Sequence, residues 1–274
     1  MQEMKFKRRK NVLRELLKAE KPSLGTHVHV VWPGWVEVIG QSRGIDYIEF
    51  AGEYAPFDLF SLENFGRAVD LFDHLSSMMK IDQEPKGYLA SRAIGSGIQN
   101  LLFADIRNVE EAREAVALAR AETPATGGMM GAAMRRDVGY VLGPGSKEYV
   151  AQLEEGVVAL MIEKESAVEH LEEILAIKGI DMIQFGPADY SMSIGLAGQW
   201  GHPKVKEAER YTIKTALKMG VAPRVELRDF RDAKPYLKMG VKHFCIGWDV
   251  DILFRWCREQ GAAFEETFKK KLKK

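Results

Sequence analysis

The sequence carries no excess of either charge. Its 274 residues include 39 lysines and arginines and 39 aspartates and glutamates, so the formal net charge at pH 7 is zero. A protein that binds nucleic acid usually presents a strongly basic face. The balanced charge therefore argues against a nucleic acid as the partner.

Cysteines and long apolar runs are also scarce. Cys245 and Cys257 are the only two cysteines, and their spacing matches no metal-binding motif, so we expect reduced thiols in a cytoplasmic protein. The basic N-terminal stretch lacks an apolar core of secretory length. No stretch of the sequence reaches the length of a membrane span, so no membrane partner is expected.

Apolar and amphipathic segments alternate along the chain. Eight apolar segments are predicted to be strands, and they are THVHVVW, DYIEFAG, MMKID, NLLFADI, VVALMI, MIQFG, VAPRVEL and KHFCIGWD. Helical segments separate them without a linker, and this alternation predicts an α/β protein with a (β/α)8 TIM barrel fold. A doubly wound open sheet is the alternative, but it would place a glycine-rich turn after the first strand, and THVHVVWPGW is not one.

The barrel accounts for most of the expected structure. We expect residues 1–24 to form a basic amphipathic helix that packs on the barrel, and residues 25–274 to form the barrel as a single domain. The final helix of that domain, over residues 250–274, has an apolar stripe. The stripe suits either its own barrel or a neighbouring subunit, to which the helix would be exchanged.

Two acidic residues follow consecutive predicted strands. Glu163 ends the strand VVALMI, a helix is expected over residues 166–178, and Asp189 follows the strand MIQFG, 26 positions after Glu163. One strand-and-helix repeat of such a barrel spans about 30 residues, and its chemistry gathers where the strands end. A hard divalent cation such as Mg²⁺ prefers paired oxygen ligands of this kind. The alternative is that Glu163 opens a helix and Asp189 caps a turn.

The segment IEKESAVEHLEEILAIKGIDMIQFGPADYSMSIG resembles the central signature of the class II pyruvate aldolases, the HpcH/HpaI (2,4-dihydroxyhept-2-ene-1,7-dioate) aldolase and citrate lyase family. The similarity extends to GTHVHVV, GEYAP, QNLLFADIRNVEEAREAV, HPKVKEA and YLKMGVKHFCIGWD, and covers most of the chain from about Gly25 onward. The resemblance implies a metal-dependent carbon–carbon lyase or aldolase that acts on a 2-oxo acid such as pyruvate, with an aldehyde as second substrate. It also implies a homo-oligomer, commonly a hexamer built as a trimer of dimers.

The resemblance assigns roles to the central segment. A divalent cation, Mg²⁺ or Mn²⁺ with Co²⁺ as a further option, would be held by Glu163 and Asp189 and would stabilise a pyruvate-type enolate as a Lewis acid. The turn of Gly186, Pro187 and Ala188 would bind the substrate carboxylate through its amides, although Pro187 has no amide hydrogen. The alternative is that this turn only connects a strand to a helix.

The family pattern is broken at positions where the resemblance implies catalytic groups. The family histidine in the turn after the second strand is replaced by Tyr54, and the aspartate that supports it from a neighbouring subunit is replaced by Gly95. The arginine after the third strand corresponds to Lys80, and a glutamine before the metal-binding glutamate corresponds to Met161. The chain therefore resembles an atypical member that lacks the usual His-Asp dyad.

Other ionisable residues point to a substitute for that dyad. His27 and His29 alternate on the first strand and share a face, and Glu49 on the second strand is expected to face inward. A cluster of His29, Glu49 and Lys80 beside the metal would supply a general base and a cation for the substrate carboxylate. Tyr54 is a candidate proton donor. Alternatively, these groups are hydrogen-bonding partners in the core, and a Schiff-base role for Lys80 is disfavoured by the metal carboxylates.

A long loop over residues 123–144 contains the pair Arg135 and Arg136. In the family the matching region lies near the mouth of the active site. This pair would bind the distal carboxylate of a longer acid. The alternative is a solvated surface pair.

Three functions are consistent with these residues. The first is aldol cleavage or formation through the enolate of a 2-oxo acid. The second keeps the enolate but ends in decarboxylation, tautomerisation or hydrolysis with a rearranged base. The third is a catalytically degenerate oligomer that only binds a metal and a keto acid.

Overall fold

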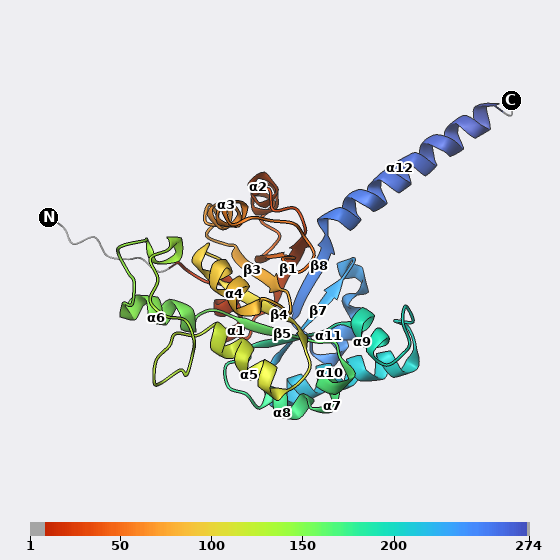
Figure 1. Cartoon of the computed structure of the whole chain (residues 1–274). Helices are drawn as coiled ribbons and strands as arrows, with labels where there is room; N and C mark the ends of the chain where they lie inside the picture. The colour runs from red at the N-terminus through yellow and green to blue at the C-terminus, as the bar shows by residue number, and fades with distance from the viewer. Residues whose placement is uncertain (1–8, 273–274) are drawn as a thin grey trace.

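The computed structural model describes residues 9–272, with side chains through residue 269, and residues 1–8 of the expected N-terminal helix lie outside this range. Eight parallel strands form a closed barrel in the order β1 to β8, with β1 paired to β8 (Figure 1). The predicted (β/α)8 fold is confirmed. The strands are β1 Ser23–Val28, β2 Tyr47–Phe50, β3 Ser76–Ile81, β4 Asn100–Ile106, β5 Val158–Ile162, β6 Met182–Phe185, β7 Ala222–Leu227 and β8 His243–Trp248.

Helices surround the barrel and connect its strands. They are α1 Val12–Lys18, α2 Pro33–Ser42, α3 Leu59–Val69, α4 Lys86–Gly95, α5 Val109–Leu118, α6 Lys147–Glu154, α7 Glu165–Glu169, α8 Leu171–Leu175, α9 Pro187–Ser193, α10 Pro203–Met219, α11 Lys234–Met239 and α12 Asp249–Leu272. Two short 3₁₀ helices, η1 Arg136–Val138 and η2 Phe230–Ala233, lie between them.

Local sequence explains several of these boundaries. Asp58 caps α3, since its carboxylate accepts the amide hydrogen of Ser61 at 2.7 Å. Pro187 occupies the first position of α9, where its missing N–H costs no hydrogen bond. The prediction of a single helix over residues 166–178 is wrong. His170 leaves the helical conformation and divides the segment into α7 and α8.

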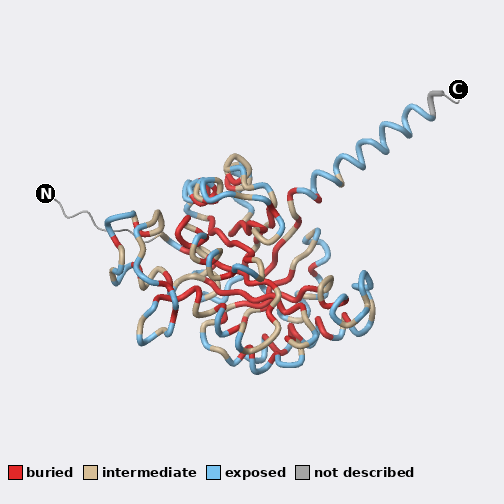
Figure 2. The backbone as a smooth tube through the Cα atoms, in the orientation of Figure 1, coloured by how far each residue is buried: buried red, intermediate tan, exposed pale blue. Residues whose placement is uncertain are grey.

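The strands are buried on both faces, as parallel strands covered by helices must be (Figure 2). Every residue of β2, β3, β5 and β6 is buried. One cluster of apolar side chains fills the barrel interior and includes Tyr47, Met78, Leu102, Met161 and Met182.

The short helix α1 closes the amino-terminal end of the barrel. Leu13 is fully buried in the interior cluster, and its amide donates to Ser76 Oγ at 2.9 Å. Asn11, which caps α1, donates to Asn100 Oδ1 at 2.7 Å. Access to the barrel is therefore from the carboxyl-terminal ends of the strands, which is where such barrels bind substrates.

The last helix, α12, leaves the barrel after β8 and projects outward (Figure 1). Large apolar side chains remain exposed along it, among them Leu253, Phe254 and Trp256, each 58–60% exposed. Among residues 9–272, no helix combines the length and apolar character needed to cross a bilayer.

Candidate active site

Glu163 and Asp189 lie at the carboxyl ends of β5 and β6. Glu163 follows β5 directly and is only 2% exposed, and its Oε1 accepts the amide hydrogen of Asp105 at 2.8 Å. Asp189 is the third residue of α9, and its Oδ1 lies 3.2 Å from Lys164 Nζ. Lys164 also pairs with Asp105 at 2.5 Å, so its ammonium group lies between the carboxylates of Asp105 and Asp189.

Burial dominates the electrostatics of Glu163. It raises the pKa of this carboxyl from its ordinary value of 4.5 to about 7, although the attraction of Lys80 acts in the opposite direction. The negative charges of Asp189 and Glu53 add to the increase. Glu163 is thus a buried carboxyl group whose charge is incompletely compensated.

The glycine before α9 makes room for this carboxylate. A Cβ atom at position 186 would lie 2.4 Å from Glu163 Oε2, so any side chain there would displace the acid. The amide of Gly186 donates to Ile162 O at 3.2 Å. In the predicted carboxylate-binding turn, the Gly186 amide is therefore already used in a hydrogen bond to the barrel, and Pro187 has no N–H. The amides of Ala188 and Asp189, at the start of α9, remain as donors for a substrate carboxylate.

Lys80 reaches the same end of the barrel from β3. Its Nζ lies 2.5 Å from Glu53 Oε2 and donates to the hydroxyl of Tyr54 at 2.7 Å. Burial acts against the ammonium charge, but attraction by Glu163, Tyr54 and Glu53 outweighs it and raises the pKa of Lys80. Burial also raises the pKa of Tyr54 to about 12. Lys80 is therefore a fixed cation, and Tyr54 a protonated hydroxyl.

The expected cluster of His29, Glu49 and Lys80 is divided into two groups. His29 Nε2 lies 3.1 Å from His27 Nε2, and the His29 ring is 5.9 Å from the Tyr54 ring, centroid to centroid. Glu49 is fully buried beneath them, where it pairs with His27 at 2.9 Å and with Arg224. Lys80 instead contacts Glu53 and Tyr54.

Three residues of this network were not predicted from the sequence to belong to the site. Arg224 could have been identified, because it is a single cation within the apolar strand VAPRVEL. Glu53 belongs to the segment GEYAP, next to Tyr54. Asp105 is distinguished only by its backbone, which adopts a left-handed conformation with φ of 58° near the end of β4. The sequence does not predict this conformation.

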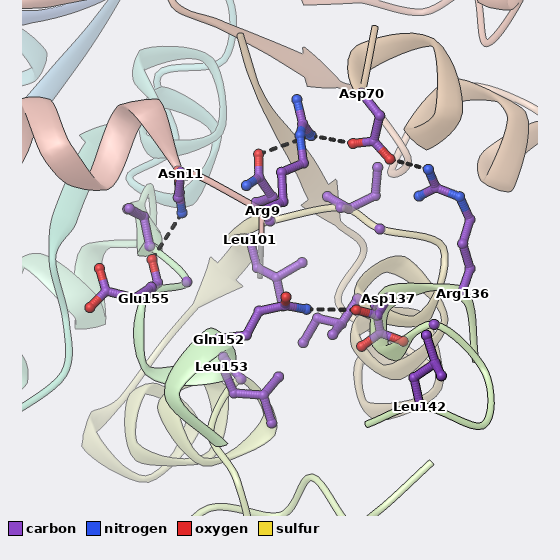
Figure 3. A pocket seen from close by; sticks show the side chains of 18 residues that line it. Arg9, Asn11, Asp70, Leu101, Arg136, Asp137, Leu142, Gln152, Leu153 and Glu155 are labelled. Carbon is purple, nitrogen blue, oxygen red and sulfur yellow. Dashed lines mark hydrogen bonds and ion pairs between the residues drawn. The ribbon is translucent and has the colours of Figure 1, made fainter. Parts of the chain in front are cut away.

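The arginine pair is not brought to this group of residues. Arg135 donates to Ser91 O on α4 at 2.6 Å, and Arg136 donates to Ser96 O at 3.0 Å and pairs with Asp70. Arg136 lines a pocket of about 380 Å³, where Figure 3 shows its ion pair with Asp70. The pocket is lined by residues that precede β4 and β5, so it lies at the opposite end of the barrel from Glu163.

Arg135 also occupies the space beside Gly95. A Cβ atom on Gly95 would lie 2.5 Å from Arg135 Cδ. The position at which the resemblance places an aspartate is therefore filled by a neighbouring side chain.

The donor set at the strand ends fits a hard divalent cation. Among residues 9–272, no three His, Cys, Asp or Glu side chains form a group that could hold a metal. Glu163 and Asp189 supply two carboxylates whose mutual repulsion a divalent cation would relieve. Mg²⁺ commonly binds through one or two carboxylates and keeps several waters, so two protein ligands suffice for it.

Known proteins resemble this chain in sequence and in fold. The 4-hydroxy-2-oxo-heptane-1,7-dioate aldolase of Salmonella dublin is 28% identical over 256 residues, which cover 93% of this chain and 95% of the relative. The solved structure of an HpcH/HpaI aldolase/citrate lyase family protein from Burkholderia cenocepacia J2315 superimposes with a TM-score of 0.84 at 25% identity, over 94% of this chain and 99% of that chain. An HpcH/HpaI aldolase from Desulfitobacterium hafniense DCB-2 superimposes with a TM-score of 0.81 at 25% identity, over 93% and 96% of the two chains.

The family model of the HpcH/HpaI aldolase/citrate lyase family matches residues 69–255. This range contains Lys80, Glu163 and Asp189, and it excludes His27 on β1 and His29 just after that strand. The chain therefore belongs to the HpcH/HpaI aldolase/citrate lyase family.

Proposed function

We propose that this protein is a divalent-metal-dependent carbon–carbon lyase, of the aldolase type, that acts on a 2-oxo acid through a pyruvate-type enolate. The observation that carries the proposal is the placement of Glu163 and Asp189 at consecutive strand ends, with Glu163 within the electrostatic reach of both Asp189 and buried Lys80. Mg²⁺ or Mn²⁺ is the proposed cofactor. Family membership supports the reaction class.

Separate residues are proposed to bind the cation and the substrate carboxylate. When bound by Glu163 and Asp189, the cation would polarise the keto oxygen of the substrate as a Lewis acid. Lys80 holds a permanent positive charge in a buried position, which suits it to the negative charge of the substrate carboxylate. The amides at the start of α9 are proposed to bind the same carboxylate.

Proton transfer is assigned to His29 and to Tyr54, which contacts both Lys80 and the ring of His29. His29 is partly buried, and burial together with the neighbouring His27 lowers its pKa, so it is available as a neutral base near pH 7. We assign it the removal of a proton from the substrate methyl group. Tyr54 keeps its own proton, and its hydroxyl, which accepts from Lys80, is proposed to donate a hydrogen bond to the substrate.

The test is exchange of the methyl protons of pyruvate in deuterated water, followed by proton NMR. We expect exchange that depends on added Mg²⁺, Mn²⁺ or Co²⁺, and a loss of at least about 100-fold in Glu163→Gln and in Asp189→Asn, because each removes a ligand charge. Glu110→Gln is the control, since the Glu110 side chain is 79% exposed. Exchange at the wild-type rate in both ligand variants would reject the assignment.

A second candidate is an enolate enzyme that forms no carbon–carbon bond, such as a decarboxylase, tautomerase or hydrolase. The contact of Lys80 with Tyr54, in place of the family histidine, favours a rearranged proton pathway of this kind. A panel of aldehydes separates the two candidates, since only an aldolase consumes pyruvate and aldehyde together. Binding of metal and pyruvate without exchange would indicate the degenerate alternative.

We further infer that the protein is a cytoplasmic homo-oligomer. The exposed apolar side chains of α12, which project from the barrel, support contact with a second copy of the chain. The thiols of Cys245 and Cys257 are both free, which supports a reducing compartment.

A further inference from the structure

A line of polar side chains runs from His29 into the barrel interior. His29 Nε2 lies 3.1 Å from His27 Nε2, and His27 Nδ1 lies 2.9 Å from Glu49 Oε1. Arg224 pairs with the other oxygen of Glu49. His27, Glu49 and Arg224 are 5%, 0% and 1% exposed, so the line runs from a partly buried end to a fully buried one.

Three strands supply this line. His27 and Glu49 are direct neighbours in the register of β1 and β2. Arg224 comes from β7, which is not adjacent to β2 in the barrel order, so its side chain crosses the interior to reach Glu49. The ion pair of Arg224 with Glu49 is fully buried, and burying two charges in this way costs free energy.

We infer that His27, Glu49 and Arg224 are positioning residues that form a proton relay behind His29 and take the place of the missing His-Asp dyad. The inference rests on the proposed function, in which His29 removes a proton from the substrate. It adds the site at which that proton is stored and the groups that hold it there.

The short contacts between these side chains indicate where the protons lie. Glu49 is ionised because Arg224, His27 and Lys80 together outweigh the effect of burial and lower its pKa to about 2, so Glu49 can only accept. His27 must then carry a proton on Nδ1. When both rings are neutral, His27 Nε2 holds a lone pair and accepts the proton on His29 Nε2, which leaves a lone pair on His29 Nδ1.

The relay moves one proton in each direction of the reaction. His29 Nδ1 accepts the proton from the substrate carbon, and the electron pair of the broken C–H bond stays on the substrate as the enolate. The proton on His29 Nε2 passes to His27 Nε2, so His29 is neutral again and His27 becomes an imidazolium beside Glu49. When the product is protonated, the two transfers reverse.

The surrounding charges favour storage on His27. Burial opposes the imidazolium of His27, but its hydrogen bond and attraction to Glu49, with help from Glu226, outweigh burial and the repulsion of Arg224, and they raise its pKa. The pKa of His29 is lowered by burial and by His27, which outweigh Asp249, Glu226 and Glu49. Tyr54, the ring neighbour of His29, stays neutral. A proton on the pair therefore resides on His27.

The first test is the pH dependence of pyruvate methyl exchange in wild type and His27→Gln. In wild type the rate should rise with pH through the raised pKa of His27, because His27 must be neutral to accept a proton. In the variant we expect a rate about 100-fold lower, KM within twofold, and a rise moved to lower pH, where His29 alone loses its proton. His170→Gln, which changes an exposed histidine, should match wild type.

A wild-type rate in His27→Gln, or a loss with an unchanged pH profile, would overturn the relay. The second test needs no variant. In protein labelled with ¹⁵N-histidine, which has six histidines, neutral His27 should carry its proton on Nδ1 and should become charged at a higher pH than His29. Neutral His27 with its proton on Nε2, or the reverse order of the two pKa values, would refute the relay whether or not the protein exchanges pyruvate protons. Absence of exchange in wild type, with the expected proton positions, would refute the proposed function alone.

Discussion

Replacing Glu163 by glutamine should make the metal-free protein more stable at pH 8. Burial raises the pKa of Glu163 from 4.5 to about 7, so the folded state binds a proton more tightly than the unfolded state. The folded state therefore loses stability as pH rises from about 4.5 to about 7, and this loss amounts to about 3 kcal/mol. Glutamine has no charge to bury, and its Oε1 can still accept the amide of Asp105.

The assay is thermal unfolding in the presence of a chelator, at pH 5 and at pH 8. A stabilisation of 3 kcal/mol corresponds to roughly 6 °C or more in Tm for a chain of this size. At pH 5 the difference should fall below about 1 kcal/mol, because Glu163 is then mostly protonated in the folded state. Added Mg²⁺ or Mn²⁺ should raise the Tm of wild type at pH 8 and leave Glu163→Gln unchanged.

Three outcomes would refute this reasoning. A variant that is equally or less stable than wild type at pH 8 would show that the Glu163 charge is already compensated in the metal-free protein. The same Tm difference at both pH values would show that the effect does not come from titration of Glu163. A response of the variant to metal equal to that of wild type would remove Glu163 from the ligand set.

Two further predictions concern the broken dyad and the last helix. Tyr54→His should not raise aldolase activity in a coupled assay with pyruvate and an aldehyde, because Arg135 fills the space beside Gly95 and Lys80 loses its hydroxyl partner; an active variant would contradict this. Leu253→Ser combined with Trp256→Ser, on α12, should lower the molar mass in light scattering without reducing helix content, and an unchanged mass would place the subunit contact elsewhere.

Neighbouring side chains occupy the space around Gly95 and contact Tyr54. The guanidinium of Arg135 is held by Ser91, and its stem lies against Gly95, so an acidic side chain could enter only after Arg135 moved. Tyr54 meanwhile shares Lys80 with Glu53. Tyr54 and Lys80, two positions at which the resemblance implies other residues, therefore contact each other, and Gly95 is packed by Arg135.

The sequence by itself determined the barrel and the location of the paired acids. Apolar runs alternating with amphipathic segments specify strands that must be covered on both faces, and a parallel barrel is the arrangement that does so. Glu163 and Asp189 follow adjacent strands in this alternation, so their place at one end of the barrel required no tertiary information. The period-two pattern of His27 and His29 likewise predicted that the two side chains lie together, and they do, although β1 ends one residue before His29.

Only the tertiary structure decided which charged groups meet. Arg224 and Glu49 are 175 positions apart and lie on strands that do not pair, so no local pattern could connect them. The division of the expected cluster, with Glu49 bound to His27 and Lys80 bound to Glu53, depends on side-chain reach across the barrel. Periodicity fixes the face on which a residue lies, whereas its partner is set by the packing of distant strands.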